Sequence, residues 1–140
     1  MQRFEVDNEL IILARKILGV SSMFVFLADE QLDELIKLSG EVLVFENGEQ
    51  VFAAGSDPEF FLVIVKGEIS VMIGEESNPI EIIRLRPGQL VGETAIIHDE
   101  THSYACFARG RLAAVSFNSK LFYGRILATQ NVNIPYLQPV

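Results

Sequence analysis

From Gly40 onward the sequence alternates apolar and polar residues with the two-residue period that is typical of β-strands. Short apolar segments follow one another to about residue 117, separated by glycines and by Asn-Gly and Pro-Gly pairs. Several short strands at nearly even spacing, with turn signals between them, favour a closed or two-sheet β fold. We therefore predict a mainly β protein with flanking helices, in which the strands form a sandwich, a jelly roll or a small barrel.

Two amphipathic helices are predicted before the strands. Residues 8–18 place apolar side chains at the three- and four-residue spacing of one helix face, and either Asp7 or Asn8 is the expected N-cap. Residues 29–39 repeat this spacing, and Gly40 is expected to end the second helix.

Turn residues divide the β region. Residues 46–48 are Glu-Asn-Gly, and Asn-Gly is the strongest short hairpin signal, so the strands on either side are expected to pair with each other. Gly67 and Gly110 are each expected to form a turn between two strands. A short helix is predicted to begin at Glu93 or Thr94.

The length of 140 residues is that of one ordinary domain. We expect a single domain over 1–140, with an N-terminal helix in 1–21, the β-roll and its leading helix in 22–117, and a C-terminal helix and tail in 118–140.

Charge and hydropathy exclude several classes of protein. The net charge is −8 and no basic cluster is present, which disfavours binding to nucleic acid or to anionic membranes. Apolar stretches end well before the roughly 20 residues of a membrane-spanning helix. The first ten residues include Glu5, Asp7 and Glu9, unlike a signal peptide, and the single Cys106 fits a reducing compartment. A cytoplasmic protein is therefore expected.

The sequence offers little to catalysis. It has no G-x-S-x-G elbow and no H-E-x-x-H zinc pair. His98 and His102 have chelating i, i+4 spacing, but the residues between them are typical of a loop, so no metal site is expected. Cys106 lies in an apolar run and is expected to be a small buried residue. We predict no enzyme activity.

Residues 86–97 contain the strongest signal for a binding site. A strand ends at Pro87-Gly88, and Gly92 stands directly before the predicted short helix. Backbone N–H groups at a helix start favour a negatively charged ligand, although strand–glycine–helix turns occur in many folds.

These residues resemble the cyclic-nucleotide-binding domain family, the β-roll module of catabolite-activator-type regulators, kinase regulatory subunits and cyclic-nucleotide-gated channels. The likeness covers about residues 22–125 and implies a β-roll, or double-stranded jelly roll, with flanking helices. Residues 26–40 look like the family's leading helix, and residues 87–95 resemble its phosphate-binding cassette. Five glycines are in register with the family's corners: Gly48, Gly55, Gly67, Gly88 and Gly92.

The resemblance implies a role for each cassette residue. Glu93 would accept a hydrogen bond from the ribose 2′-hydroxyl of cyclic AMP or cyclic GMP, and the amides of Thr94 and Ala95 would bind the cyclic phosphate. The family's phosphate-pairing arginine falls on His102, followed by Ser103. The implied ligand residues are therefore Gly92, Glu93, Thr94, Ala95, His102 and Ser103.

The cassette departs from the family pattern at the position of the phosphate-pairing arginine. No Lys or Arg lies between Arg86 and Arg109, and an imidazole cannot copy the permanent, two-point contact of a guanidinium. Losing such a contact costs about 1.5–3 kcal/mol, so cyclic-nucleotide binding is expected to be weakened or lost. Two routes stay open: a protonated His102 pairing with phosphate, or a ligand without phosphate.

Two functions follow from this interpretation. The first is a non-catalytic regulatory or sensor module, with Leu121, Phe122 and Tyr123 as candidates to cover the ligand. The second is a degenerate β-roll that serves as a protein–protein interaction module, with the pair Phe60-Phe61 as candidate contacts. The partner is then a small molecule or a protein, and a homodimer stays open because the family often dimerises.

Overall fold

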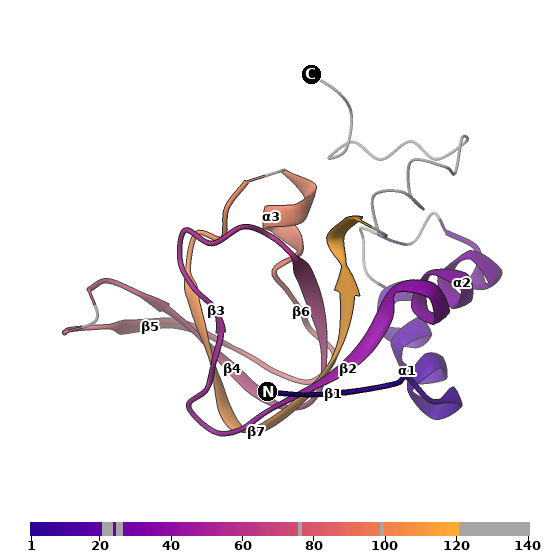
Figure 1. The fold of residues 1–140 in the computed structure, drawn as a ribbon, viewed down its shortest axis with the longest axis horizontal. Helices are drawn as coiled ribbons and strands as arrows, with labels where there is room; N and C mark the ends of the chain where they lie inside the picture. Colours follow the sequence, from indigo (N-terminus) through magenta and orange to yellow (C-terminus); the bar gives the residue numbers. More distant parts are fainter. Residues whose placement is uncertain (21–23, 25–26, 76, 99, 121–140) are drawn as a thin grey trace.

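The fold is mainly β, as predicted. The computed structural model describes residues 1–20, 24, 27–75, 77–98 and 100–120 (Figure 1). The elements in chain order are β1 (Gln2–Phe4), α1 (Asn8–Gly19), α2 (Asp29–Ser39), β2 (Gly40–Phe45), β3 (Gln50–Phe52), β4 (Phe60–Ile73), β5 (Ile80–Leu85), β6 (Leu90–Val91), α3 (Glu93–Ile97) and β7 (Ala105–Asn118). The residues expected to cover the ligand, 121–123, lie outside the described residues, as does most of the predicted C-terminal helix.

Two long antiparallel strands, β4 and β7, form the centre of the sheet. The strand order is β1-β2-β7-β4-β5, with β3 paired to β7 and β6 paired to β4. Pairing of β4 with β7 runs from Phe60 opposite Asn118 to Met72 opposite Ala105. Every other strand except β1 pairs directly with one of these two, so their register fixes the arrangement of the β-roll (Figure 1).

The predicted turns at Gly67 and Gly110 are wrong, because both glycines lie inside long strands and bend them. Gly67 has a φ of +85° and Gly110 a φ of +69°. The register of β4 against β7 shifts on both sides of Lys66. A Cβ atom on Gly67 would lie 2.5 Å from the carbonyl oxygen of Arg111, so only glycine lets the bent strands approach this closely. At both glycines, the sequence pattern that predicted a turn corresponds to a bend within a continuous strand.

The predicted hairpin at residues 46–48 is also wrong in its pairing. The turn itself forms, since the N–H of Glu49 donates to the carbonyl of Glu46 at 3.0 Å. The strands on either side, β2 and β3, each pair with β7 instead of with each other. The corner also contacts β7: the N–H of Gly48 donates to the carbonyl of Ala108 at 2.8 Å, and Asn47 Oδ1 accepts from the N–H of Gly110 at 2.8 Å.

The two predicted helices form at their expected positions. Asp7 caps α1, accepting from the N–H of Leu10 at 2.8 Å, and Gly40 follows the last residue of α2. Among the described residues no helix is long and apolar enough to cross a membrane.

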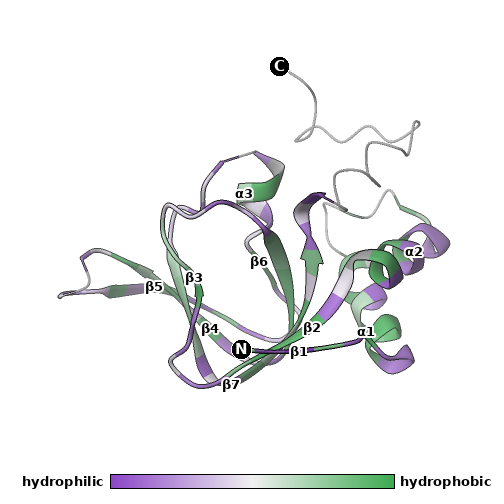
Figure 2. Ribbon diagram, viewed as in Figure 1, coloured by the Kyte–Doolittle hydropathy of each residue, from purple (hydrophilic) through white to green (hydrophobic). Residues whose placement is uncertain are grey.

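Alternation along β4 and β7 produces two hydrophobic cores. Figure 2 shows hydrophobic residues on the strands of the roll and on α1 and α2. Phe61 and Val63 face the helices, while Leu62 and Ile64 face the interior of the roll. The first core consists of buried residues of α1, α2, β4 and β7 together with Phe24, Leu27 and Ile96. The second core fills the roll and reaches Phe52 and Val91, which also border the cavity described below.

We predict that Gly67→Ala destabilises the protein more than Gly48→Ala. The two glycines have nearly the same φ, +85° and +83°, but a Cβ on Gly48 meets nothing within 4 Å. Gly48→Ala should therefore cost only the strain of a left-handed residue, about 1–2 kcal/mol, and Gly67→Ala about 3 kcal/mol or more because of the added clash. Urea unfolding of both variants measures this difference, and equal losses would contradict the assigned close approach.

Candidate ligand-binding site

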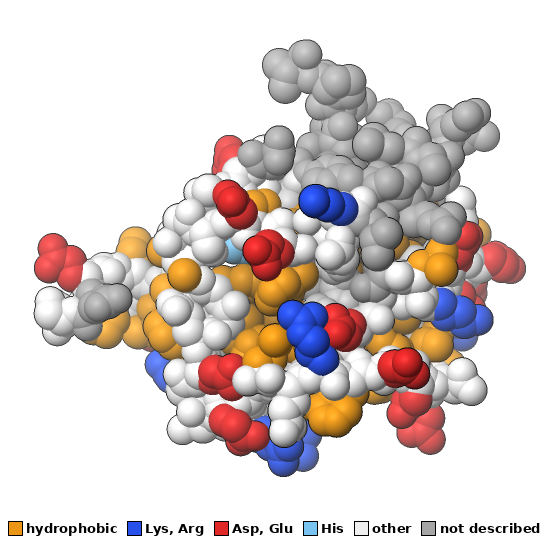
Figure 3. Space-filling model, viewed as in Figure 1, with side chains coloured by type: hydrophobic (Ala, Val, Ile, Leu, Met, Phe, Trp, Pro, Cys, Tyr) orange, Lys and Arg blue, Asp and Glu red, His pale blue; other side chains and the backbone are white. Residues whose placement is uncertain are grey.

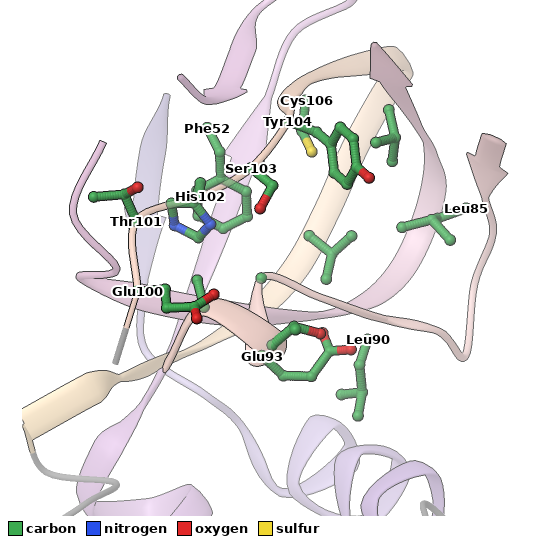
Figure 4. A pocket seen from close by; sticks show the side chains of 15 residues that line it. Phe52, Leu85, Leu90, Glu93, Glu100, Thr101, His102, Ser103, Tyr104 and Cys106 are labelled. Atoms are coloured by element: carbon green, nitrogen blue, oxygen red, sulfur yellow. The ribbon is translucent and has the colours of Figure 1, made fainter. Parts of the chain in front are cut away.

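All six residues expected to bind a ligand line one cavity of about 280 Å³ (Figure 4). α3 and its N-cap supply Gly92 to Ala95, and the segment before β7 supplies His102 and Ser103. The size is close to the lower end of the roughly 300–1,000 Å³ of small-molecule sites. Tertiary structure thus brings together two segments that the sequence separates.

The remaining lining residues were missed by the sequence analysis. They are Phe52, Val71, Leu85, Leu90, Val91, Glu100, Thr101, Tyr104 and Cys106. Most are apolar strand residues, and a strand residue that faces a cavity has the same alternating pattern as one that faces a core. Only the register of the paired strands distinguishes the two, so no sequence signal identified them.

Gly92 is required at the cavity wall for two reasons. It is the N-cap of α3 with a φ of +86°, a left-handed conformation that favours glycine. A Cβ at this position would also lie 2.9 Å from two ring carbons of Phe52 and 3.3 Å from Cε1 of His102. The predicted start of the short helix at Glu93 is confirmed.

His102 is a buried, uncharged part of the wall. Its residue surface is 6% exposed, and its ring stacks on Phe52 with centroids 4.1 Å apart and planes inclined by 25°. The backbone is fixed on both sides, since its N–H donates to Ser56 at 2.9 Å and its carbonyl accepts from Gly55 at 2.8 Å. Nε2 is buried without a hydrogen-bond partner among the described residues. Burial lowers the pKa of His102 below its ordinary 6.5, so the neutral imidazole is favoured.

The other ionisable groups of the lining are carboxyls and a thiol. Glu93 is partly buried, and this burial raises its pKa. Glu100 is exposed at the edge of the cavity. Burial raises the pKa of Cys106 to about 11, so it is a thiol at neutral pH and packs as the small buried residue that was predicted.

No lysine or arginine is among the residues that the structure places around this cavity. Arg86 and Arg109, the arginines nearest in sequence, lie outside the lining and have other partners. Arg86 pairs with Glu68 at 3.4 Å, and Arg109 donates from Nε to Ser70 Oγ at 2.8 Å. His98, the second histidine, is exposed and also lies outside the lining. The part of the wall that the structure describes therefore carries no fixed positive charge.

The fold is a roll built on two bent strands. Its cavity lies between a short helix with a glycine N-cap and the segment that leads into the last strand. This arrangement is that of a cyclic-nucleotide-binding type of β-roll. Comparison with known families agrees: the model of the cyclic nucleotide-binding domain family matches residues 42–127, more than half of the chain. The chain belongs to the cyclic nucleotide-binding domain family.

Individual relatives are distant. A cAMP-dependent protein kinase regulatory subunit from Mucor circinelloides f. lusitanicus is 29% identical over 82 residues, which is 59% of this chain and 19% of that protein. The chain spans about a fifth of the length of the curated relatives that it matches.

Solved structures share the fold. The regulatory domain of Toxoplasma gondii PKA with cAMP has a TM-score of 0.79 at 19% identity, covering 90% of this chain and 49% of that one. The regulatory subunit of a cAMP-independent protein kinase A from Trypanosoma cruzi, bound to guanosine, has a TM-score of 0.70 at 16% identity, covering 91% of this chain and 44% of that one.

The burial of His102 predicts a loss of stability in mild acid. Because its pKa is below 6.5 in the folded chain, the unfolded chain binds more protons as the pH falls through 6.5. This contribution to the free energy of unfolding is full above pH 6.5 and decreases as the pH falls toward the lowered pKa. Imidazole NMR titration should give a pKa below 6.5 for His102.

The matched variant is His102→Gln, which cannot take up this proton. Unfolding measured at pH 7 and pH 5 should show a smaller decrease in stability for the variant than for the wild type. An equal decrease would assign the acid sensitivity to other groups.

Proposed function

We propose that this chain is a non-catalytic regulatory domain whose cavity binds an uncharged small ligand of the nucleoside type and binds cyclic AMP and cyclic GMP weakly. The observation that carries the proposal is the charge of the described cavity wall, which combines two carboxyls and a buried neutral imidazole with no lysine or arginine.

A cyclic phosphate bound in this cavity would have no permanently charged cation beside it among the described lining residues. Burying an anion without a cation is costly, and Glu93 and Glu100 add repulsion when their carboxyls are ionised. A proton on His102 would provide a charge, but burial already disfavours that proton near neutral pH. The route through a protonated His102 is therefore the less favourable of the two that the sequence leaves open.

An uncharged ring with attached hydroxyls avoids this penalty. Leu85, Leu90 and Val91 offer apolar surface for a flat ring. The carboxyl of Glu93 can accept a hydrogen bond from a ligand hydroxyl when ionised, as the family resemblance implies. Ser103 offers a further hydroxyl partner from the opposite wall.

The relatives support both parts of the proposal. The matching kinase proteins are regulatory subunits, which is consistent with a regulatory role and with the absence of catalysis. The structurally similar trypanosomal subunit belongs to a cAMP-independent kinase and holds guanosine, so this fold accommodates a nucleoside without phosphate.

The test is calorimetric titration of the wild type and His102→Arg with adenosine, guanosine, cyclic AMP and cyclic GMP. We expect the wild type to bind at least one nucleoside more tightly than its cyclic nucleotide. His102→Arg should tighten cyclic-nucleotide binding about ten- to a hundredfold, because a charge-assisted contact contributes about 1.5–3 kcal/mol. His98→Arg is the matched control, since it adds the same charge outside the cavity lining.

Three results would contradict the proposal. Equal tightening by His98→Arg would show that overall charge, rather than the cavity wall, controls binding. Tight cyclic-nucleotide binding by the wild type would overturn the charge argument. If no variant binds any of the four compounds, the ligand-sensing role fails and the interaction-module interpretation is favoured.

A further inference from the structure

Strand β5 is an apolar, unpaired edge of the sheet. It is the last strand in the order β1-β2-β7-β4-β5 and pairs only with β4 among the described elements. Ile80, Ile82 and Ile83, together with Ile73 on β4, are 47–57% exposed. The hairpin of β4 and β5 projects from the roll as an arm with hydrophobic atoms on its surface (Figures 1 and 3). An edge of this kind presents unpaired backbone groups to another strand.

A β-bulge determines which side chains of β5 share a face. The register places Arg84 opposite Ser70 and Glu81 opposite Met72, with a shift between Val71 and Met72 that leaves Ile82 unpaired. As a result, Glu81 and Arg84 lie on the same, outer face although they are three residues apart. Their proximity is direct, since Arg84 Nη2 contacts Glu81 Oε1 at 2.8 Å.

The inner face of β5 is apolar. Ile80 pairs with Ile73 and Leu85 with Ile69. Ile69 belongs to the core inside the roll, and the alternation of β4 puts Ile73 on the same face, near the exposed end of the strand. Ile83, opposite Val71, lies on this face as well. The strand therefore presents an apolar inner row and a charged outer pair of opposite sign.

We propose that β5 pairs antiparallel with β5 of a second copy of this chain, about a two-fold axis between Ile82 and Ile83. In this register Glu81 of each copy lies opposite Arg84 of the other, on the outer face. Ile80 of each copy lies opposite Leu85 of the other, on the inner face. The proposal is independent of what the cavity binds.

A second copy fits because the strand is complementary to itself. A two-fold interface uses the same surface twice, so every residue must match its symmetry partner. Shifting the register by one residue would set Glu81 against Ile83 or Leu85 and place outer side chains opposite inner ones. Charges on an edge strand usually prevent pairing, whereas here the two-fold axis brings opposite charges together.

The projection of the hairpin leaves room for this pairing. Its tip stands away from α1 and α2, which cover the opposite end of the sheet (Figure 1). Two arms can therefore meet edge to edge and form a continuous sheet. The exposed isoleucines of the two copies would then cover each other.

Sedimentation equilibrium on the wild type and charge-reversal variants tests the interface. We expect a dimer that dissociates on dilution. Glu81→Arg and Arg84→Glu should each raise the dimer Kd about tenfold or more, because like charges then meet at two symmetry-related positions. The double variant should restore the wild-type Kd, since the opposite signs are exchanged but still matched. Arg3→Glu, in an exposed ion pair at the other sheet edge, is the matched control and should change nothing.

Hydrogen exchange of the wild type tests the interface independently of whether the variants fold. In the wild type, the β5 amides should exchange more slowly at high than at low protein concentration. A wild type that stays monomeric up to about 1 mM overturns the proposal. So do β5 amides that are insensitive to concentration, single variants that dimerise as the wild type does, or a folded double variant that stays monomeric.

Discussion

The antiparallel pairing of β4 with β7 is the interaction on which the rest of this structure depends. Both strands are 14 residues long and alternate between two cores, so each strand binds the helices with one face and fills the roll with the other. Left-handed glycines, Gly67 on β4 and Gly110 on β7, bend them where straight strands would continue as a flat sheet. This bend shapes the roll, and the core residues Phe52, Val71, Val91 and Cys106 also border the cavity.

The cavity wall shows how packing sets chemistry. Gly92, Phe52 and His102 form one stack, in which the glycine leaves space for the two rings. Because the imidazole is enclosed by apolar surface and its Nε2 lacks a partner among the described residues, the ring is favoured without charge. The contacts that hold the histidine in place thus also disfavour its charged form. Family membership establishes the fold, and the burial of this one side chain is the observation on which the proposed ligand preference rests.

The sequence analysis predicted the positions of most helices and strands, but it did not predict correctly which strands pair with each other. Helix caps and the start of α3 depend on local geometry, and these predictions are confirmed by Asp7 and Glu93. The hairpin at residues 46–48 failed because a turn signal does not specify which strand pairs with which. β7 is 14 residues long and pairs with all six residues of β2, whereas β3, with three residues, could pair with no more than three of them.

The sequence by itself determined the mainly β class of the fold and the absence of Lys and Arg between Arg86 and Arg109. Its resemblance to the family indicated six residues that the structure places around one cavity. Residue type, order and motif can be recognised without knowing which segments meet. Tertiary structure alone decided that His102 is buried, that its pKa is lowered, and that apolar strand residues complete the wall. Burial depends on which segments meet across the bent sheet, and those contacts join residues far apart in the chain. For that reason no local pattern contains them.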